Sequence, residues 1–142
     1  MRVAIDIESD NLFPFITKIH CMSVLDIDTG AVSTFRECPR NVDEWELVVA
    51  HNGLGFDYWA LWKVWNVRLP IDRCIDTLVW SRTLWPDRPW GHSLADWGKH
   101  LGMSKGEHSD WTQYSEAMKE YCEQDSRICA AIYRELIRER DQ

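Results

Sequence analysis

The N-terminal segment constrains the fold more than any other part of the chain. Residues 3 to 8 alternate between the two faces of an extended chain, in the order Val3, Ala4, Ile5, Asp6, Ile7 and Glu8. A period of two is typical of a β-strand, and it places the three large apolar side chains on one face. Asp6 and Glu8 share the other face. This segment therefore predicts a strand that begins the sheet and presents two carboxylates in one direction.

The rest of the chain predicts further strands and then helices. Residues 18–27 and 31–35 are expected to be strands joined by the turn Asp28-Thr29-Gly30, and the apolar run Leu47 to Ala50 is typical of a strand buried on both faces. Helices are expected over residues 55–66, 77–84, 93–102 and 115–140, with a short edge strand at 72–75. This order favours an α/β sheet that mixes antiparallel and parallel strands.

Length and composition predict one folded domain over residues 1–142, with 45% apolar residues and nine tryptophans. No apolar run approaches the roughly 20 residues that cross a bilayer, so we expect no membrane partner. The first strand leaves no room for a signal peptide, and five cysteines without a Cys-x-x-Cys pair fit a reducing compartment. We therefore expect a cytoplasmic protein, in the bacterial host if a phage encodes it.

The net charge of −7 argues against a passive, sequence-independent DNA-binding module, which needs many contacts from Lys and Arg to phosphate. It does not argue against an enzyme that holds only a short nucleic-acid end. Cations bound in a carboxylate-rich cleft are the largest charges there and reverse its local sign.

Two groups of tryptophans have to be placed in the core or on the surface. The first group follows a predicted helix at i, i+3 and i+6: Trp59, Trp62 and Trp65. A stripe of this kind predicts core packing rather than a binding site. Trp85 and Trp90 lie in a proline-flanked loop, and we expect them to pack on the core; an exposed patch for a partner is the alternative.

Asp76 stands directly before a predicted helix, which is the usual place of an N-cap. The five histidines, at positions 20, 51, 92, 100 and 108, show no spacing typical of metal ligands. We therefore assign them no catalytic role.

Asp125 is the most unusual residue of the last predicted helix. The helix has an apolar stripe formed by Met118, Tyr121, Cys122, Ile128, Cys129, Ile132 and Leu136. Asp125 occupies the middle of this stripe, where a carboxylate costs several kcal/mol unless it is paired or metal-bound. No Lys or Arg stands nearby on the same face, and Arg127 lies on a different one. Asp125 is therefore expected to bind a cation together with other carboxylates.

Such an oxygen-only ligand set selects Mg²⁺ or Mn²⁺ over zinc. Two such ions can activate a water and hold the attacking and leaving oxygens of a phosphodiester in line. Tyr121 lies four residues before Asp125 on the same helix face, and its hydroxyl is suited to orient that water. An ordinary core aromatic is the alternative interpretation of Tyr121.

Three segments resemble the motifs of the DnaQ-like 3′–5′ exonucleases, which have the ribonuclease H-like fold. They are Asp6-Ile7-Glu8, His51 to Asp57 and Tyr121 to Asp125. A tyrosine four residues before the last aspartate marks the DEDDy subtype, whereas the histidine subtype would carry its histidine where this chain has Glu120. Segments 17–21, 74–79 and 92–98 are similar to proofreading domains of family A DNA polymerases from phages. The resemblance runs from about residue 3 to 137.

The resemblance implies a five-stranded mixed sheet, with three antiparallel and two parallel strands, flanked by helices. It implies Asp6, Glu8 and Asp125 as ligands of one metal ion and Asp6 with Asp57 at a second. Tyr121 would position the nucleophilic water. The implied contacts to the 3′-terminal nucleotide are Ser9, Leu12 and Asn52, and plain core packing is the alternative for Leu12.

The expected activity is a metal-dependent 3′–5′ exonuclease. It would hydrolyse single-stranded DNA from the 3′ end to nucleoside 5′-monophosphates by a two-metal mechanism, using two Mg²⁺ or Mn²⁺ ions. It would act alone or in proofreading during phage DNA replication, with a DNA polymerase as partner. The alternatives are an RNA exonuclease of the same fold and a non-catalytic module that docks on a polymerase.

Overall fold

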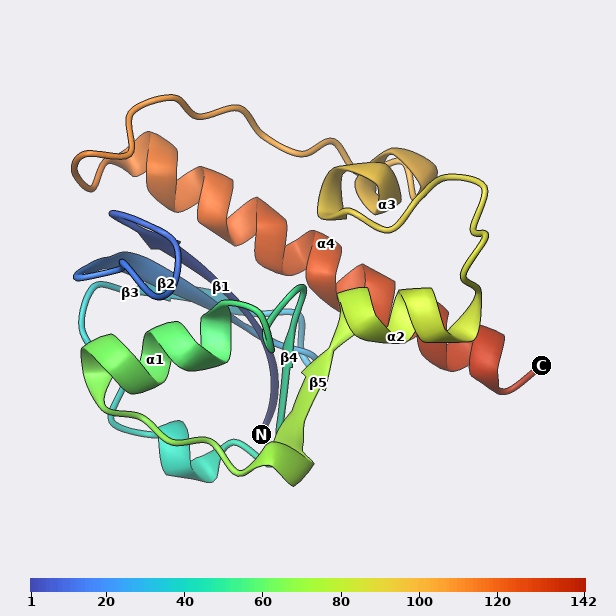
Figure 1. Ribbon diagram of the computed structural model, residues 1–142, viewed down its shortest axis with the longest axis horizontal. Helices are drawn as coiled ribbons and strands as arrows, with labels where there is room; N and C mark the ends of the chain where they lie inside the picture. The colour runs from blue at the N-terminus through green and yellow to red at the C-terminus, as the bar shows by residue number, and fades with distance from the viewer.

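A computed structural model describes residues 1–142 and contains a five-stranded sheet with helices on both faces (Figure 1). The strands are β1 (Arg2–Ser9), β2 (Ile19–Asp26), β3 (Val32–Phe35), β4 (Leu47–Ala50) and β5 (Cys74–Asp76), in the order β3-β2-β1-β4-β5. The β1–β2 and β2–β3 pairs are antiparallel, and the β1–β4 and β4–β5 pairs are parallel. The predicted mixed sheet of three antiparallel and two parallel strands is confirmed.

The helices are α1 (Asp57–Trp65), α2 (Thr77–Leu84), α3 (Leu94–His100) and α4 (Glu116–Arg140). Two short 3₁₀ turns, Val42–Glu44 and Ile71–Arg73, were not predicted. The predicted capping box is present at the start of α3, where the Ser93 hydroxyl accepts a bond from the Asp96 N–H and the Asp96 carboxylate accepts one from the Ser93 N–H. Ser115 caps α4 in the same way through its hydroxyl.

The alternation of β1 divides the core between the two faces of the sheet. Val3, Ile5 and Ile7 belong to the cluster that α1 covers through residues such as Leu61. Ala4 belongs to a second cluster, with residues of α4. Figure 1 shows α1 on one side of the sheet and the long α4 crossing the other. Since Asp6 and Glu8 follow Ala4 at intervals of two, they lie on the face of β1 that meets α4.

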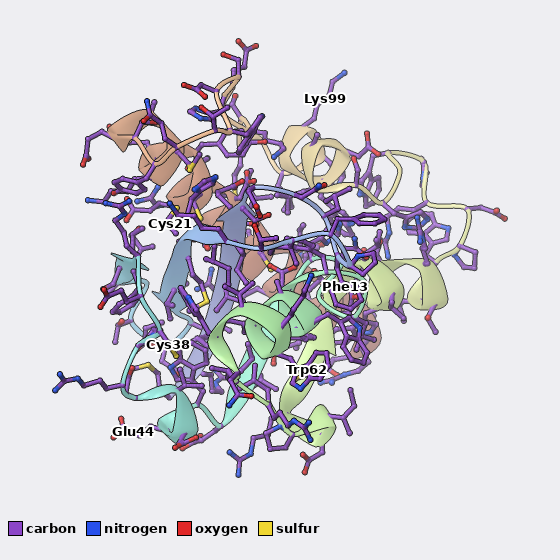
Figure 2. All side chains as sticks on the ribbon, turned by 60° about the vertical axis from the view of Figure 1, so that its left-hand side comes forward. Phe13, Cys21, Cys38, Glu44, Trp62 and Lys99 are labelled. Carbon is purple, nitrogen blue, oxygen red and sulfur yellow. The ribbon has the colours of Figure 1, made fainter.

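The prediction that the α1 tryptophans form core is wrong for two of the three. Trp59 and Trp62 are 47% and 39% exposed. Each step of three residues falls about 60° short of a full helical turn, so a run at i, i+3, i+6 winds away from the sheet. The buried line of α1 instead contains Ala60 and Leu61. Trp62 projects from α1 toward the segment that leads to β5, where it lines an apolar surface pocket (Figure 2).

The two loop tryptophans differ in exposure. Trp90 stacks on His100, with ring centroids 3.5 Å apart, and contacts Trp97 edge-on, so it packs on the core as predicted. The expected core packing is wrong for Trp85, which is 42% exposed at the surface. The buried guanidinium of Arg88 lies among these rings and is paired with Glu139 of α4.

None of the helices combines the length and the apolar character needed to cross a membrane.

Candidate active site

All eight residues predicted for the site line one open cavity of about 500 Å³. They are Asp6, Glu8, Ser9, Leu12, Asn52, Asp57, Tyr121 and Asp125. They come from the end of β1 and the loop after it, from the turn before α1, and from α4. Segments more than 100 residues apart in the chain therefore meet at the C-terminal ends of β1 and β4, where parallel strands present their functional side chains.

Asp6 and Glu8 form the centre of the site. A carboxylate oxygen of each, together with Sγ of Cys122, lies within a group whose members are at most 4.8 Å apart. The Cys122 thiol is fully buried and donates to the backbone carbonyl of Asp6 (3.3 Å), so its contact supports the strand rather than the cavity. Asp57 and Asp125 lie on the same cavity but outside this tight group.

The turn before α1 is held in place by Asp76. This carboxylate accepts bonds from the backbone N–H groups of Asn52 (2.9 Å) and Leu54 (3.0 Å), and it also caps α2 through Leu78. Asn52 has a φ of 66°, a left-handed conformation that asparagine tolerates. A Cβ at Gly55 would lie 2.4 Å from Oδ1 of Asn52, so a larger residue there would displace the Asn52 side chain from its present position. The turn so fixed delivers Asp57, as the first residue of α1, to the cavity.

His51 lines the cavity, but both of its ring nitrogens are occupied. Nδ1 bonds to the Thr77 hydroxyl (2.8 Å) and Nε2 to the His92 carbonyl (2.8 Å). Burial lowers the pKa of His51 to about 4, so the ring is neutral. Its role is to tie the end of β4 to α2 and to the loop before α3.

The carboxyl groups of the site are shifted strongly toward protonation. Burial, and next the charge of Asp125, raise the pKa of Asp6 from 3.8 to about 7. Burial and the neighbouring Asp6 raise the pKa of Glu8 from 4.5 to about 11. Burial and Asp6 also raise the pKa of Asp57 well above its usual value. Like charges placed this close cannot all ionise without a compensating cation.

Two carboxylate oxygens of the site are buried without any hydrogen-bond partner: Oδ2 of Asp6 and Oδ1 of Asp125. Buried acceptors are nearly always satisfied in folded proteins, so orphaned ones point to a missing partner. Clustered carboxylate oxygens are the ligands that Mg²⁺ and Mn²⁺ prefer. The residues present therefore fit a divalent metal ion.

Asp125 has no basic partner on its own helix face, as expected, but it is paired with a lysine from a different segment, which was not anticipated from the sequence. Nζ of Lys105, from the loop between α3 and α4, donates to Oδ2 of Asp125 (2.8 Å) and to the Tyr121 hydroxyl (2.5 Å). Burial raises the pKa of Asp125, and the hydrogen bond and charge of Lys105 oppose this rise. Lys105 lies 20 residues before Asp125, so no helical spacing could indicate the pair.

The same loop supplies one wall of the cavity through Trp111, which contacts the ring of Tyr121 edge-on at 5.3 Å. The Trp111 carbonyl accepts a bond from His20 Nε2 (2.8 Å), which ties the loop to β2. From the N-terminal part of the chain, Leu12 also lines the cavity. Its side chain is 70% exposed, which excludes core packing for it. The Ser9 hydroxyl donates to the Asn11 carbonyl (2.7 Å) and so shapes the loop that carries Leu12.

Sequence reasoning missed three contributors to the site. Trp111 and Lys105 lie in a polar loop with no periodicity, and nothing local marks them. Asp76 was predicted as an N-cap, which is confirmed, but its bonds to residues 52 and 54 depend on the β4–β5 pairing.

Two DNA-directed DNA polymerases are similar to the chain in sequence. The polymerase of Enterobacteria phage T3 is 29% identical to the chain and that of Escherichia phage T7 is 28% identical. Each alignment covers 93% of this chain and 26% of the polymerase, so the chain spans about a quarter of the length of these curated relatives. No family model matches the chain.

Three solved structures are similar in fold. A nuclease in its apo form has a TM-score of 0.79 at 22% identity, covering 99% of this chain and 74% of its own. NrnC of Brucella melitensis, bound to pGG, has a TM-score of 0.77 at 20% identity with the same coverage. RNase D of Escherichia coli, an exoribonuclease involved in structured RNA processing, has a TM-score of 0.72 at 15% identity, covering 99% of this chain and 40% of its own. The chain therefore has the ribonuclease H-like fold of the DnaQ-like 3′–5′ exonucleases, as its three acidic motifs predicted.

Proposed function

We propose that the chain is a metal-dependent 3′–5′ exonuclease of the DEDDy type that hydrolyses single-stranded DNA to nucleoside 5′-monophosphates. The observation that carries this proposal is the convergence of four carboxylates and Tyr121 on one open cavity, with two carboxylate oxygens left without partners. Burying so many acidic groups together destabilises the fold, and such a cost is typical of a functional site.

The residues proposed to hold two divalent ions, Mg²⁺ or Mn²⁺, are Asp6, Glu8, Asp57 and Asp125. When bound, such ions supply an activated water and stabilise the charge that develops on the phosphodiester. The protein brings the ligands together from β1, α1 and α4, and its rigid strand and helix scaffold keeps their separations constant.

The remaining residues are proposed to bind and orient the substrate. Tyr121, which lines the cavity together with Asp125, would hold the attacking water through its hydroxyl. The exposed side chain of Leu12 packs on the 3′-terminal base, and Ser9 and Asn52 lie near the same nucleotide. The cavity of about 500 Å³ has the size of a site for a small ligand, which supports the binding of a short strand end.

The similarity to phage DNA polymerases supports DNA as the substrate and a DNA polymerase as the partner. The chain would act in proofreading or as a stand-alone enzyme during phage DNA replication. The host cytoplasm is then the place of action. An RNA exonuclease of the same fold is the second candidate, supported by the fold shared with RNase D. A non-catalytic module is disfavoured, because such a module does not need to keep all four carboxylates together with Tyr121.

The test is the hydrolysis of matched 5′-labelled single-stranded DNA and RNA oligonucleotides with Mg²⁺, with Mn²⁺ and with excess chelator. We expect a ladder of products shortened from the 3′ end, faster on DNA, and none with chelator. Asp6→Ala should abolish the activity, whereas Asp87→Ala, at an exposed position outside the cavity lining, should not. Activity that persists in Asp6→Ala or in chelator contradicts the proposed site. Faster hydrolysis of RNA than of DNA shows that the substrate is RNA, which is the second candidate function.

A further inference from the structure

Lys105 connects two residues of the proposed active site although it belongs to none of the three acidic motifs. Its Nζ donates to Oδ2 of Asp125 and to the Tyr121 hydroxyl, and it lies 4.3 Å from the centroid of the Tyr121 ring. The ion pair is largely withdrawn from solvent, with side-chain exposures of 28% for Lys105 and 5% for Asp125. A pair this shielded is screened far less than one on the surface.

The contact divides the two oxygens of Asp125 between different tasks. Oδ2 is bound by Lys105, and Oδ1 is buried without a partner. Lys105 therefore fixes the rotation of this carboxylate and leaves its other oxygen free for a metal ion. The same ammonium fixes the hydroxyl of Tyr121, so one residue sets the relative position of a proposed ligand and of the proposed water-orienting group.

The loop that carries Lys105 is anchored without it. Nε2 of Gln124 donates to the Ser104 carbonyl (3.0 Å), and His20 holds the Trp111 carbonyl from β2. These bonds join the loop to α4 and to the sheet on either side of Lys105. Replacing the ammonium therefore removes its two polar contacts while the loop keeps its attachment.

We propose that Lys105 is a positioning residue and a built-in counter-cation of the active site: it holds Tyr121 and Asp125 for the hydrolytic step while its charge opposes the binding of divalent ions. This inference rests on the proposed function. It assigns two effects to Lys105. When the side chain is replaced, the affinity for the metal ion should rise while the turnover number falls.

Loss of the charge tightens metal binding, because a positive charge next to the ligand set repels a second cation. Loss of the hydrogen bonds slows turnover, because a small displacement of a group that orients the nucleophile costs up to about a hundredfold in rate. A purely structural role predicts weaker metal binding and slower turnover together. The combination of tighter binding with slower turnover separates the two explanations.

The experiment measures Mn²⁺ binding by isothermal titration calorimetry, and kcat and KM on a single-stranded DNA oligonucleotide, for the wild type and three variants. Lys105→Met removes the charge, Lys105→Arg keeps it, and Lys99→Met is the matched control. Lys99 projects from α3 into solvent, so its replacement changes the net charge equally without touching the site (Figure 2). Thermal melting followed by circular dichroism verifies that each variant is folded.

For Lys105→Met we expect a Mn²⁺ dissociation constant lower by on the order of tenfold. We also expect a kcat lower by about tenfold to a hundredfold with KM unchanged. Lys105→Arg should bind Mn²⁺ as the wild type does but with reduced kcat, and Lys99→Met should match the wild type in every respect.

Unchanged or weaker Mn²⁺ binding by Lys105→Met overturns the counter-cation role, and an unchanged kcat overturns the positioning role. If Lys105→Met does not fold, Lys105→Arg decides, since Mn²⁺ binding tightened in that variant contradicts the proposal. A wild type that hydrolyses no oligonucleotide but shows the calorimetric difference refutes the proposed function and leaves the charge effect of Lys105 established.

Discussion

Replacing Asp6 by asparagine should stabilise the metal-free protein at neutral and alkaline pH while it abolishes activity. Burial raises the pKa of Asp6 to about 7 in the folded chain, against 3.8 for an ordinary aspartate. The folded state therefore binds a proton that the unfolded state releases between these two values. The contribution of Asp6 to the free energy of unfolding is therefore fully present below pH 4, and it is lost as the pH rises to 7.

The magnitude follows from the same two values. One pKa unit corresponds to about 1.4 kcal/mol, so the difference between 3.8 and about 7 amounts to about 4 kcal/mol at pH 8. This is an upper limit, because Asp6 is only partly buried by surface area and solvent in the open cavity screens its charge. For a domain of this size, such a gain raises the melting temperature by on the order of 10 °C.

The assay is thermal melting in excess chelator at pH 4.5 and pH 8 for the wild type, Asp6→Asn and the exposed control Asp87→Asn. We expect Asp6→Asn to melt higher than the wild type at pH 8, with the difference largely gone at pH 4.5, and the control to follow the wild type. An Asp6→Asn variant that melts at or below the wild type at pH 8 would falsify the view that this carboxylate is held ionised at a cost to stability.

The other predictions concern metal binding, catalysis and the scaffold of the site. Saturating Mn²⁺ should raise the melting temperature of the wild type at pH 8 but not that of Asp6→Asn, since only a site with its charged ligand binds the ion to the folded state. Tyr121→Phe should lower kcat by on the order of a hundredfold and leave the calorimetric Mn²⁺ affinity unchanged; a kcat equal to the wild type would make Tyr121 an ordinary packing residue. Asp76→Ala should cost about 3 kcal/mol in urea unfolding, because it frees four backbone N–H groups at once, and a loss no larger than that of the exposed control Asp72→Ala would show that these bonds contribute little. Glu139→Ala should destabilise the fold by about 3 kcal/mol in the same measurement, because it leaves the buried guanidinium of Arg88 unpaired; the exposed Glu120→Ala is its control.

Most elements of the fold could be predicted from local sequence patterns. The alternation at residues 3–8 predicted β1 and the shared face of Asp6 and Glu8, and both are present. The start of α2 follows from Asp76 as its N-cap, and α3 begins after Ser93 with the predicted capping box. Patterns of this kind depend on residues within one turn or one strand, so they can be recognised in the sequence alone.

Exposure was less well predicted than element type. Trp59 and Trp62 are apolar residues at helical spacing, yet they lie outside the α1–sheet contact. Which side of a short helix faces the sheet depends on how the helix is docked. A run of three equally spaced aromatic residues does not contain that information.

By itself, the sequence determined the acidic residues that converge, because their motifs lie at the ends of strands and on one face of α4, where the order of elements already brings them together. Only the tertiary structure decided how Asp125 is compensated and how the turn at residues 52–57 is held. Lys105 reaches Asp125 across 20 residues, and Asp76 reaches Asn52 across 24, from segments with no periodic relation to their partners. Such pairings arise when loops and strand ends are placed by the packing of the whole sheet, and a one-dimensional pattern records neither the distance nor the direction between them.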